Sequence, residues 1–124
     1  MTNYLTEHFT LDEMQRSHSA RLSRIPNYAP PSAVDNLKRL CSEILEPIRE
    51  AFDSPIYVNS AYRSQRVNRL IGGAKNSYHL YGRAADITAT DVERLKDVVQ
   101  DLRNSGVICP TELIEYNSFI HLAL

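Results

Sequence analysis

The sequence contains few cysteines and no long apolar run. Only Cys41 and Cys109 occur among the 124 residues, which is too few for a disulfide framework. Their apolar neighbours favour small buried side chains over a cross-link. No apolar stretch approaches the roughly 20 residues of a membrane-spanning helix. The first residues also lack the basic and apolar regions of a signal peptide, so we expect a soluble product made in the cytoplasm.

Runs of like charge are missing as well. The 14 basic and 15 acidic residues are scattered along the chain, and the formal net charge is -1. This pattern contains no cluster of basic residues that would bind nucleic acid or an anionic membrane, and it argues against a polyanion-binding role. A chain of this length can bury a real hydrophobic core, so we predict one monomeric domain over residues 1–124.

The first half of the sequence is typical of helices joined by a proline-rich loop. Thr10 and Glu13 have the spacing of a capping box, which predicts a short helix after Thr10. Residues 1–31 therefore form an N-terminal helical and Pro-rich segment. From Ser32 to Phe52, apolar residues recur at three- and four-residue spacing, which predicts an amphipathic helix. We expect Pro47 to kink this helix near its end.

The second half alternates between strand and helix patterns. Residues 56–62 and 84–89 are each typical of a strand, with a short helix between them. A longer helix is expected from Thr90 to Gly106, and residues 111–124 have two apolar runs around a turn, which predicts a hairpin. This order indicates an α+β fold with a small, mostly antiparallel sheet flanked by helices.

Four side chains of the second half have the chemistry that a hydrolytic zinc site needs. Such a site uses three neutral or anionic ligands, an open position for water and a nearby carboxylate. His79 lies in a loop, Asp86 in the strand that follows and His121 in the last strand, while Glu115 precedes His121 by six residues. These residues are the candidate metal ligands and the candidate carboxylate.

The hairpin register decides whether Glu115 faces the same way as His121. Because side chains alternate along a strand, the two share a face only if the turn holds an odd number of residues. We predict a three-residue loop, Tyr116 to Ser118. That loop pairs Glu115 with Phe119 and Leu113 with His121.

These residues also have a simpler interpretation. A single histidine on a strand is commonly an ordinary core or surface residue, and we interpret His8 and His18 in that way. Asp86 fits an ordinary structural role less well. It lies between Ala85 and Ile87, and a carboxylate in such apolar surroundings needs a cation or several hydrogen-bond donors. Residue types and spacing alone leave both interpretations open, since scattered ligands lack the tight pattern of a metal-binding helix.

The stretch SYHLYGRAAD, residues 77–86, fits the pattern S-x-H-x-x-G-x-A-x-D of the zinc D-alanyl-D-alanine peptidases. The segment PIYVNSAYRSQRVNRLIGGAKNS resembles that family's strand, Tyr-Arg-Ser bend and helix end, and ELIEYNSFIHLAL resembles its closing hairpin. The family includes phage L-alanyl-D-glutamate endopeptidases and shares its fold with the Hedgehog signalling domain. The resemblance covers nearly the whole chain, is strongest to stand-alone phage-type and bacterial members, and implies a Hedgehog/DD-peptidase-like fold.

The resemblance implies a role for each matching residue of the candidate site. His79, Asp86 and His121 would bind Zn²⁺. Glu115 matches the family's general base, which takes a proton from the attacking water and hands it to the leaving amine.

Two further residues match positions that contact substrate in the family. Arg63, in the Tyr-Arg-Ser bend, corresponds to an arginine that holds substrate and stabilises developing negative charge; a structural salt bridge is the alternative. Ser77 matches a serine that hydrogen-bonds substrate or orients His79, and a turn-forming serine is the alternative.

The function that the resemblance implies is zinc-dependent hydrolysis of peptidoglycan stem peptides next to a D-amino acid. Both carboxypeptidase and endolysin-like endopeptidase activity fit. The alternatives are a non-catalytic zinc-binding module and a phage or prophage assembly component on the same fold. Because the wall lies outside the membrane and no signal peptide is expected, the resemblance implies release by lysis or by a non-Sec route.

Overall fold

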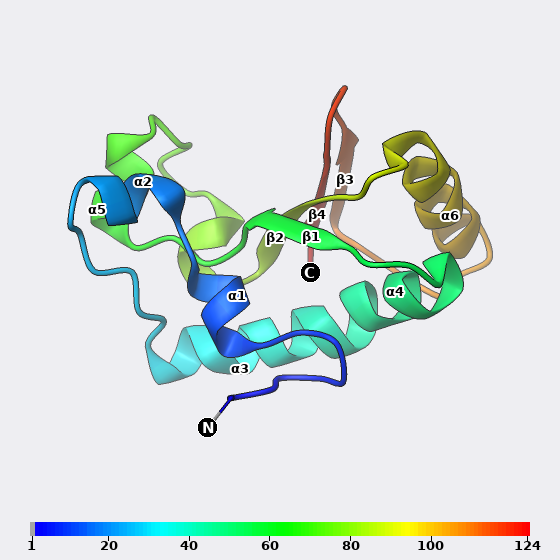
Figure 1. The fold of residues 1–124 in the computed structure, drawn as a ribbon, viewed down its shortest axis with the longest axis horizontal. Coiled ribbons are helices and arrows are strands. Elements are labelled where there is room, and N and C mark those ends of the chain that lie inside the picture. Colours follow the sequence, from blue (N-terminus) through cyan, green and yellow to red (C-terminus); the bar gives the residue numbers. More distant parts are fainter. Residues whose placement is uncertain (1) are drawn as a thin grey trace.

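The computed structural model describes residues 2–124 as a four-stranded antiparallel sheet surrounded by helices (Figure 1). The strands lie in the order β1-β2-β4-β3 and comprise β1 (Tyr57–Ser60), β2 (Ala84–Thr88), β3 (Glu112–Glu115) and β4 (Ile120–Ala123). The helices are α1 (Leu11–Gln15), α2 (His18–Leu22), α3 (Pro31–Leu40), α4 (Glu46–Phe52), α5 (Gln65–Leu70) and α6 (Val92–Asn104). The predicted α+β fold with a small antiparallel sheet is confirmed.

The predicted long helix is present, and it is irregular directly before Pro47. A π-helical turn, Cys41–Leu45, joins α3 to α4, and the amide of Glu46 bonds to the carbonyl of Cys41. Pro47 has no N–H to donate back into the preceding turn, so the wider turn directly before it accommodates the missing bond. The combined helix runs beneath the sheet (Figure 1) and carries the largest share of the hydrophobic core, including Leu37, Leu40, Cys41, Ile44, Leu45, Ile48 and Phe52.

Local hydrogen bonds explain where the helices begin. The predicted capping box of α1 is confirmed: the Glu13 amide donates to Thr10 Oγ1 at 3.2 Å and the Thr10 amide to Glu13 Oε1 at 3.3 Å. The predicted start of α6 at Thr90 is wrong by one residue. The Asp91 carboxylate is the cap and accepts from the Arg94 amide at 3.0 Å. An aspartate is at least as good an N-cap as a threonine, so the later residue takes the position.

Both cysteines are free. Cys41 is fully buried in the core, and burial raises the pKa of its thiol to about 12, so it is an inert packing residue. The expectation of a small buried side chain is wrong for Cys109, which is exposed after α6.

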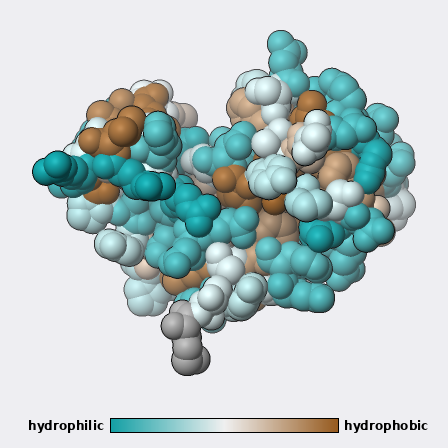
Figure 2. Space-filling view, in the orientation of Figure 1, coloured by the Kyte–Doolittle hydropathy of each residue, from teal (hydrophilic) through white to brown (hydrophobic). Residues whose placement is uncertain are grey.

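The helices divide into two groups on either side of the sheet. In Figure 1, α2 and α5 lie on the left, whereas α4 and α6 lie on the right. The hairpin of β3 and β4 rises between them, and Figure 2 shows a notch in the surface between the α2–α5 side and the hairpin. No helix within residues 2–124 is long and apolar enough to cross a membrane.

Candidate metal centre

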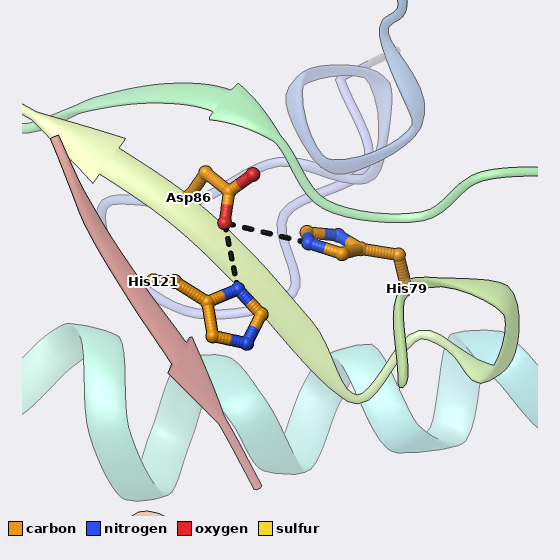
Figure 3. A group of neighbouring side chains, drawn as sticks. All are labelled: His79, Asp86 and His121. Carbon is orange, nitrogen blue, oxygen red and sulfur yellow. Dashed lines mark hydrogen bonds and ion pairs between the residues drawn. The ribbon is translucent and has the colours of Figure 1, made fainter. Parts of the chain in front are cut away.

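Three potential ligands converge at the centre of the sheet (Figure 3). His79 comes from a 3₁₀ turn, Tyr78–Tyr81, Asp86 from β2 and His121 from β4. Asp86 and His121 are directly paired residues of neighbouring strands, which places their side chains on one face. One ligand atom from each of the three residues lies within 4.8 Å of the others. The structure therefore brings together the three ligands expected from the sequence.

The ring of His79 is oriented by the backbone. Its Nδ1 lies 2.6 Å from the carbonyl oxygen of Ala61, which can only accept, so Nδ1 carries the proton. Its Nε2 lies 3.4 Å from Asp86 Oδ1. Ser77 Oγ accepts from the His79 amide at 3.2 Å and so caps the turn that carries the ring.

Three side chains surround the carboxylate of Asp86. His121 Nδ1 lies 2.8 Å and His79 Nε2 3.4 Å from its Oδ1, while Arg63 Nη2 lies 3.4 Å from its Oδ2. Burial alone would raise the pKa of Asp86, but the hydrogen bonds from the two histidines outweigh burial and hold its pKa far below the usual range. The carboxylate is thus charged and points both oxygens at cationic or donor groups.

Arg63 lies beside the ligands instead of in open solvent. Its Nε donates to Ser60 Oγ at 3.0 Å, and only 13% of its side chain is exposed. Burial lowers the pKa of its guanidinium, and the charge of Asp86 opposes that shift. Arg63 therefore makes the salt bridge that was the alternative to substrate contact, although the partner is a candidate metal ligand.

A glutamate that was not singled out in the sequence contacts the last ligand. Glu112 Oε1 lies 2.9 Å from Nε2 of His121, on the side of the ring away from Asp86. Hydrogen bonding to Asp86 and, after the opposing effect of burial, to Glu112 raises the pKa of His121. With Asp86 at Nδ1 and Glu112 at Nε2, both ring nitrogens of His121 have carboxylate partners.

The predicted hairpin register is wrong, and the error concerns Glu115. The loop holds four residues, 116–119, closed by a bond from the Tyr116 amide to the Phe119 carbonyl at 2.9 Å. Glu115 therefore pairs with Ile120, and Ile114 pairs with His121. Glu115 points to the opposite face, where it is exposed and accepts from Gln100 on α6 at 3.1 Å.

In the observed register, Glu112 and not Glu115 lies on the same face as His121. Glu112 takes the face of His121 because it lies an even number of positions from Ile114, the residue paired with His121. An even-numbered loop would have singled out Glu112 from the sequence. Nothing in the composition of YNSF decided between a loop of three and a loop of four residues.

His121 is the candidate ligand that reaches a surface cleft. A cleft of about 420 Å³ is lined by His121 and Glu112 on one side and by Ser77 and Tyr78 on the other. Ile114 and Tyr116 extend the hairpin wall. Tyr116 is stacked on Phe119 with their ring centroids 4.5 Å apart, which stabilises the tip of that wall.

The donor set fits a zinc ion. Ligand atoms about 2.0–2.2 Å from a tetrahedral ion lie roughly 3.3–3.6 Å apart, and His79 Nε2 and Asp86 Oδ1 are separated by 3.4 Å. His121 Nδ1 and Asp86 Oδ1 are closer, at the hydrogen-bond distance of 2.8 Å, so these two side chains would have to separate to hold an ion between them. Two imidazoles and one carboxylate, with one side open to a cleft, are the ligands of a catalytic zinc site. Each ligand also has an outer partner: Ala61 for His79, Arg63 for Asp86 and Glu112 for His121.

Comparison with known proteins agrees with this geometry. A family model described as peptidase M15 matches residues 7–123. The zinc D-Ala-D-Ala carboxypeptidase of Streptomyces albus G is 50% identical over 63 residues, which are 50% of this chain. The match covers 24% of that relative, so this chain corresponds to well under two thirds of its length.

Proposed function

Since the chain belongs to the peptidase M15 family, whose cofactor is Zn²⁺, we propose that it hydrolyses peptidoglycan stem peptides next to a D-amino acid. The observation that carries this proposal is the convergence of His79, Asp86 and His121 beside a cleft that His121 lines, with Glu112 on the cleft wall. The name of the Streptomyces relative supports a D-alanyl peptide as the substrate class.

We propose that His79 Nε2, Asp86 Oδ1 and His121 Nδ1 hold the ion. These three atoms face one another (Figure 3). When bound, Zn²⁺ supplies a Lewis acid that polarises the scissile carbonyl and makes water acidic enough to react at neutral pH. The outer partners keep the imidazoles in the correct tautomer and orientation.

Glu112 replaces Glu115 as the proposed general base. It lines the cleft beside His121, whereas Glu115 lies on the other face of the hairpin. Oε1 of Glu112 accepts from His121 Nε2–H, and within residues 2–124 its Oε2 has no hydrogen-bond partner. That oxygen is available to take a proton from water in the cleft and to return it to the leaving amine.

Arg63, in the bend after β1, and Ser77, at the start of the 3₁₀ turn, are the other proposed site residues. Arg63 holds Asp86 through Nη2, and within residues 2–124 its Nη1 donates to no other residue, which leaves a donor for substrate charge. Ser77 both caps the turn of His79 and lines the cleft, so we propose that it positions this ligand and borders the substrate.

The test is a cleavage assay on a panel of soluble muropeptides with the zinc-loaded wild type, Glu112→Gln and Glu115→Gln. Glu115→Gln is the matched control, because it makes the same change on the same strand but on the opposite face. We expect the wild type and Glu115→Gln to cleave and Glu112→Gln to lose at least about 100-fold in kcat with zinc retained. The products distinguish a carboxypeptidase from an endopeptidase.

Two outcomes contradict the proposal. If all three proteins hold zinc and none cleaves any muropeptide, the metal serves a non-catalytic binding module. If Glu115→Gln loses activity and Glu112→Gln keeps it, the assignment of the base is wrong while the peptidase function stands.

A further inference from the structure

The charged residues are scattered in the sequence but segregated in the folded molecule. Residues 14–34 and 54–85 contain eight of the 14 basic residues and no acidic residue. These segments pack together: α2 contacts α5, and the Tyr62 amide donates to the Met14 carbonyl at 2.8 Å. The side of the molecule that carries α2 and α5 is therefore strongly basic. We call residues 14–30 and 62–76 the basic lobe.

Most of these positive charges are free to bind a partner. Within residues 2–124, six basic side chains of the lobe are exposed and take part in no ion pair, namely Arg16, Arg21, Arg24, Arg66, Arg69 and Lys75. Arg63 is the exception, because it pairs with Asp86 at the metal centre. The basic lobe thus concentrates unneutralised charge in a protein whose formal net charge is -1.

A groove of about 500 Å³ lies along the N-terminal segment of the basic lobe, lined by residues between Asp12 and Tyr28. Its lining includes Arg16, Arg21 and Arg24, with the exposed ring of Tyr28 and one acid, Asp12. The cationic groups outnumber the acid, and arginine is the side chain best suited to grip phosphate or carboxylate oxygens through two donors.

The groove is tied to the bend that carries Arg63. Asn27, on the groove lining, donates from Nδ2 to the Tyr62 carbonyl at 3.0 Å. Its Oδ1 accepts from the Ser64 amide at 2.7 Å. These bonds hold the residues on both sides of Arg63 and so connect the groove to the bend that carries it.

One arginine of the groove occupies an unfavourable backbone conformation. Arg24 follows α2 with φ of 54°, in the left-handed region where glycine is strongly preferred. The Ile25 amide bonds back to the Ala20 carbonyl at 2.8 Å, the pattern of a helix end that glycine commonly closes. An arginine here costs stability and places another charge on the groove.

We propose that the basic lobe is a binding surface, separate from the metal centre, for a bacterial wall polymer that carries repeated phosphodiester groups. This inference rests on the proposed function only for its choice of the wall as the source of the polymer. The expectation against a polyanion-binding role came from the spacing of charges in the sequence, and the packing of α2 on α5 revises it.

An anionic membrane is the competing partner. Leu22, Leu70 and Ile71 are exposed on the same lobe, and Figure 2 shows apolar side chains gathered over α2 and α5. A flat bilayer does not enter a groove, however, whereas a flexible polymer can lie along one and reach all its arginines. The concave lining therefore favours the polymer.

The test compares two triple variants of the whole zinc-loaded chain. The lobe variant carries Arg21→Gln, Arg66→Gln and Arg69→Gln. The control variant carries Lys38→Gln, Arg39→Gln and Arg103→Gln, which remove the same charge from exposed positions outside the lobe. The lobe variant changes two residues in the last turn of a helix, Arg21 and Arg69, whereas all three changes of the control lie in a last turn. The control therefore loses at least as much helix stabilisation as the lobe variant.

Binding is measured by brief co-sedimentation on ice with purified walls that carry a phosphodiester polymer, with the same walls stripped of that polymer, and with anionic phospholipid vesicles. We expect the lobe variant to bind walls about tenfold more weakly than wild type, with a shallower salt dependence, and the control variant to bind like wild type. Loss of binding on stripping supports the phosphodiester polymer as the ligand, whereas binding that is retained by the stripped walls overturns the proposal. Equal binding by the two variants, no binding to walls, or binding to vesicles alone overturns it.

Arg24→Gly provides a second test that a folding defect cannot imitate. Glycine suits the left-handed conformation, so the unfolding temperature should stay the same or rise while wall binding falls. Wall binding that does not fall shows that Arg24 is not part of the surface and counts against the proposal.

Cleavage of a soluble muropeptide, which carries no polymer, separates this inference from the proposed function. The lobe variant should cleave it at the wild-type rate. If no protein cleaves the peptide but the lobe variant alone loses wall binding, the proposed function fails and the polymer surface stands.

Discussion

Glu112 contacts a candidate ligand through one carboxylate oxygen, and this contact can be separated from its proposed role as a base. The amide oxygen of glutamine still accepts from His121 Nε2–H but takes up no proton, whereas alanine removes both properties. Glu112→Ala should therefore weaken zinc affinity by about 10–100-fold, and Glu112→Gln should bind zinc nearly as well as wild type. Competition with a chelating dye measures both affinities.

The control for this prediction is Glu115→Ala. Glu115 bonds to Gln100 and touches no candidate ligand, so its loss should leave zinc affinity unchanged. Equal affinities for Glu112→Ala and wild type would show that the contact at 2.9 Å does not orient His121.

Gly82 is a second residue whose position can be tested on its own. It ends the 3₁₀ turn of His79 with φ of 72°, and an added Cβ would lie 2.5 Å from the carbonyl oxygen of Ala33 on α3. Gly82→Ala should lower the free energy of unfolding by about 2–4 kcal/mol, because backbone strain and overpacking act together. Urea denaturation measures the change.

Gly106→Ala is the matched control. Gly106 has φ of 78°, but nothing lies within 4 Å of its added Cβ, so only the strain of about 1 kcal/mol is expected. Similar losses at the two glycines would mean that the approach of the turn to α3 is not tight.

At the scale of elements, the N-terminal segment is fastened to α4 by a buried carboxylate. Glu46 accepts from Thr6 Oγ1 at 2.8 Å and from the backbone amide of His8, and its Oε2 lies 2.9 Å from His8 Nδ1. Burial would raise the pKa of Glu46, but the hydrogen bonds from His8 and Thr6 outweigh it and the pKa is lowered. His8 is thus a structural residue, as interpreted from its sequence surroundings.

The lowered pKa of Glu46 predicts how stability depends on pH. A carboxylate with a lower pKa in the folded than in the unfolded protein stabilises the fold above the unfolded value, about 4.3, and loses this effect as pH falls through the folded value. Glu46→Gln should cost about 1–3 kcal/mol at pH 7 and clearly less at pH 4. Urea denaturation at the two pH values tests this.

Glu50→Gln, an exposed change on the same helix, is the control and should have little effect at either pH. A destabilisation by Glu46→Gln that is the same at pH 7 and pH 4 would contradict an ionised Glu46 as the source.

The elements that could be predicted from the sequence are those decided by short-range chemistry. The capping box of α1 depends only on the side chains of Thr10 and Glu13 and on the helix that follows, and its prediction is confirmed. The hairpin was predicted, but its register was not, because one residue more in the loop turns every later side chain to the other face. A backbone hydrogen bond between Tyr116 and Phe119 closes a four-residue loop, and the composition of the loop does not predict this length.

The convergence of the three candidate ligands was predicted for a different reason. His79, Asp86 and His121 stood out by chemistry and by resemblance, whereas their outer partners Ala61 and Glu112 depend on tertiary contacts. The basic lobe likewise depends on tertiary contacts. No run of charge marks it in the sequence, because it arises only when two acid-free segments pack together.

At the scale of the whole molecule, the metal centre is the point where distant parts of the chain meet. The ligands come from the 3₁₀ turn beside the α2–α5 side, from the central strand β2 and from the hairpin that forms the opposite wall of the cleft. An ion bound by all three residues would link these segments in the folded state only. Zinc should therefore stabilise the entire fold and not merely order a loop.

Removal of zinc should accordingly lower the unfolding temperature of the whole domain. At a free zinc concentration about 1,000 times the dissociation constant, binding contributes about 4 kcal/mol, which corresponds to roughly 10–20 °C for a domain of this size. Thermal unfolding with excess zinc and with a chelator measures the difference. His121→Gln should unfold at one temperature under both conditions, because it removes a ligand, whereas the exposed change His18→Gln should keep the full zinc-dependent shift. A wild type that is indifferent to zinc would show that the three side chains pack together for the sake of the sheet, with Asp86 neutralised by Arg63 and His121 alone.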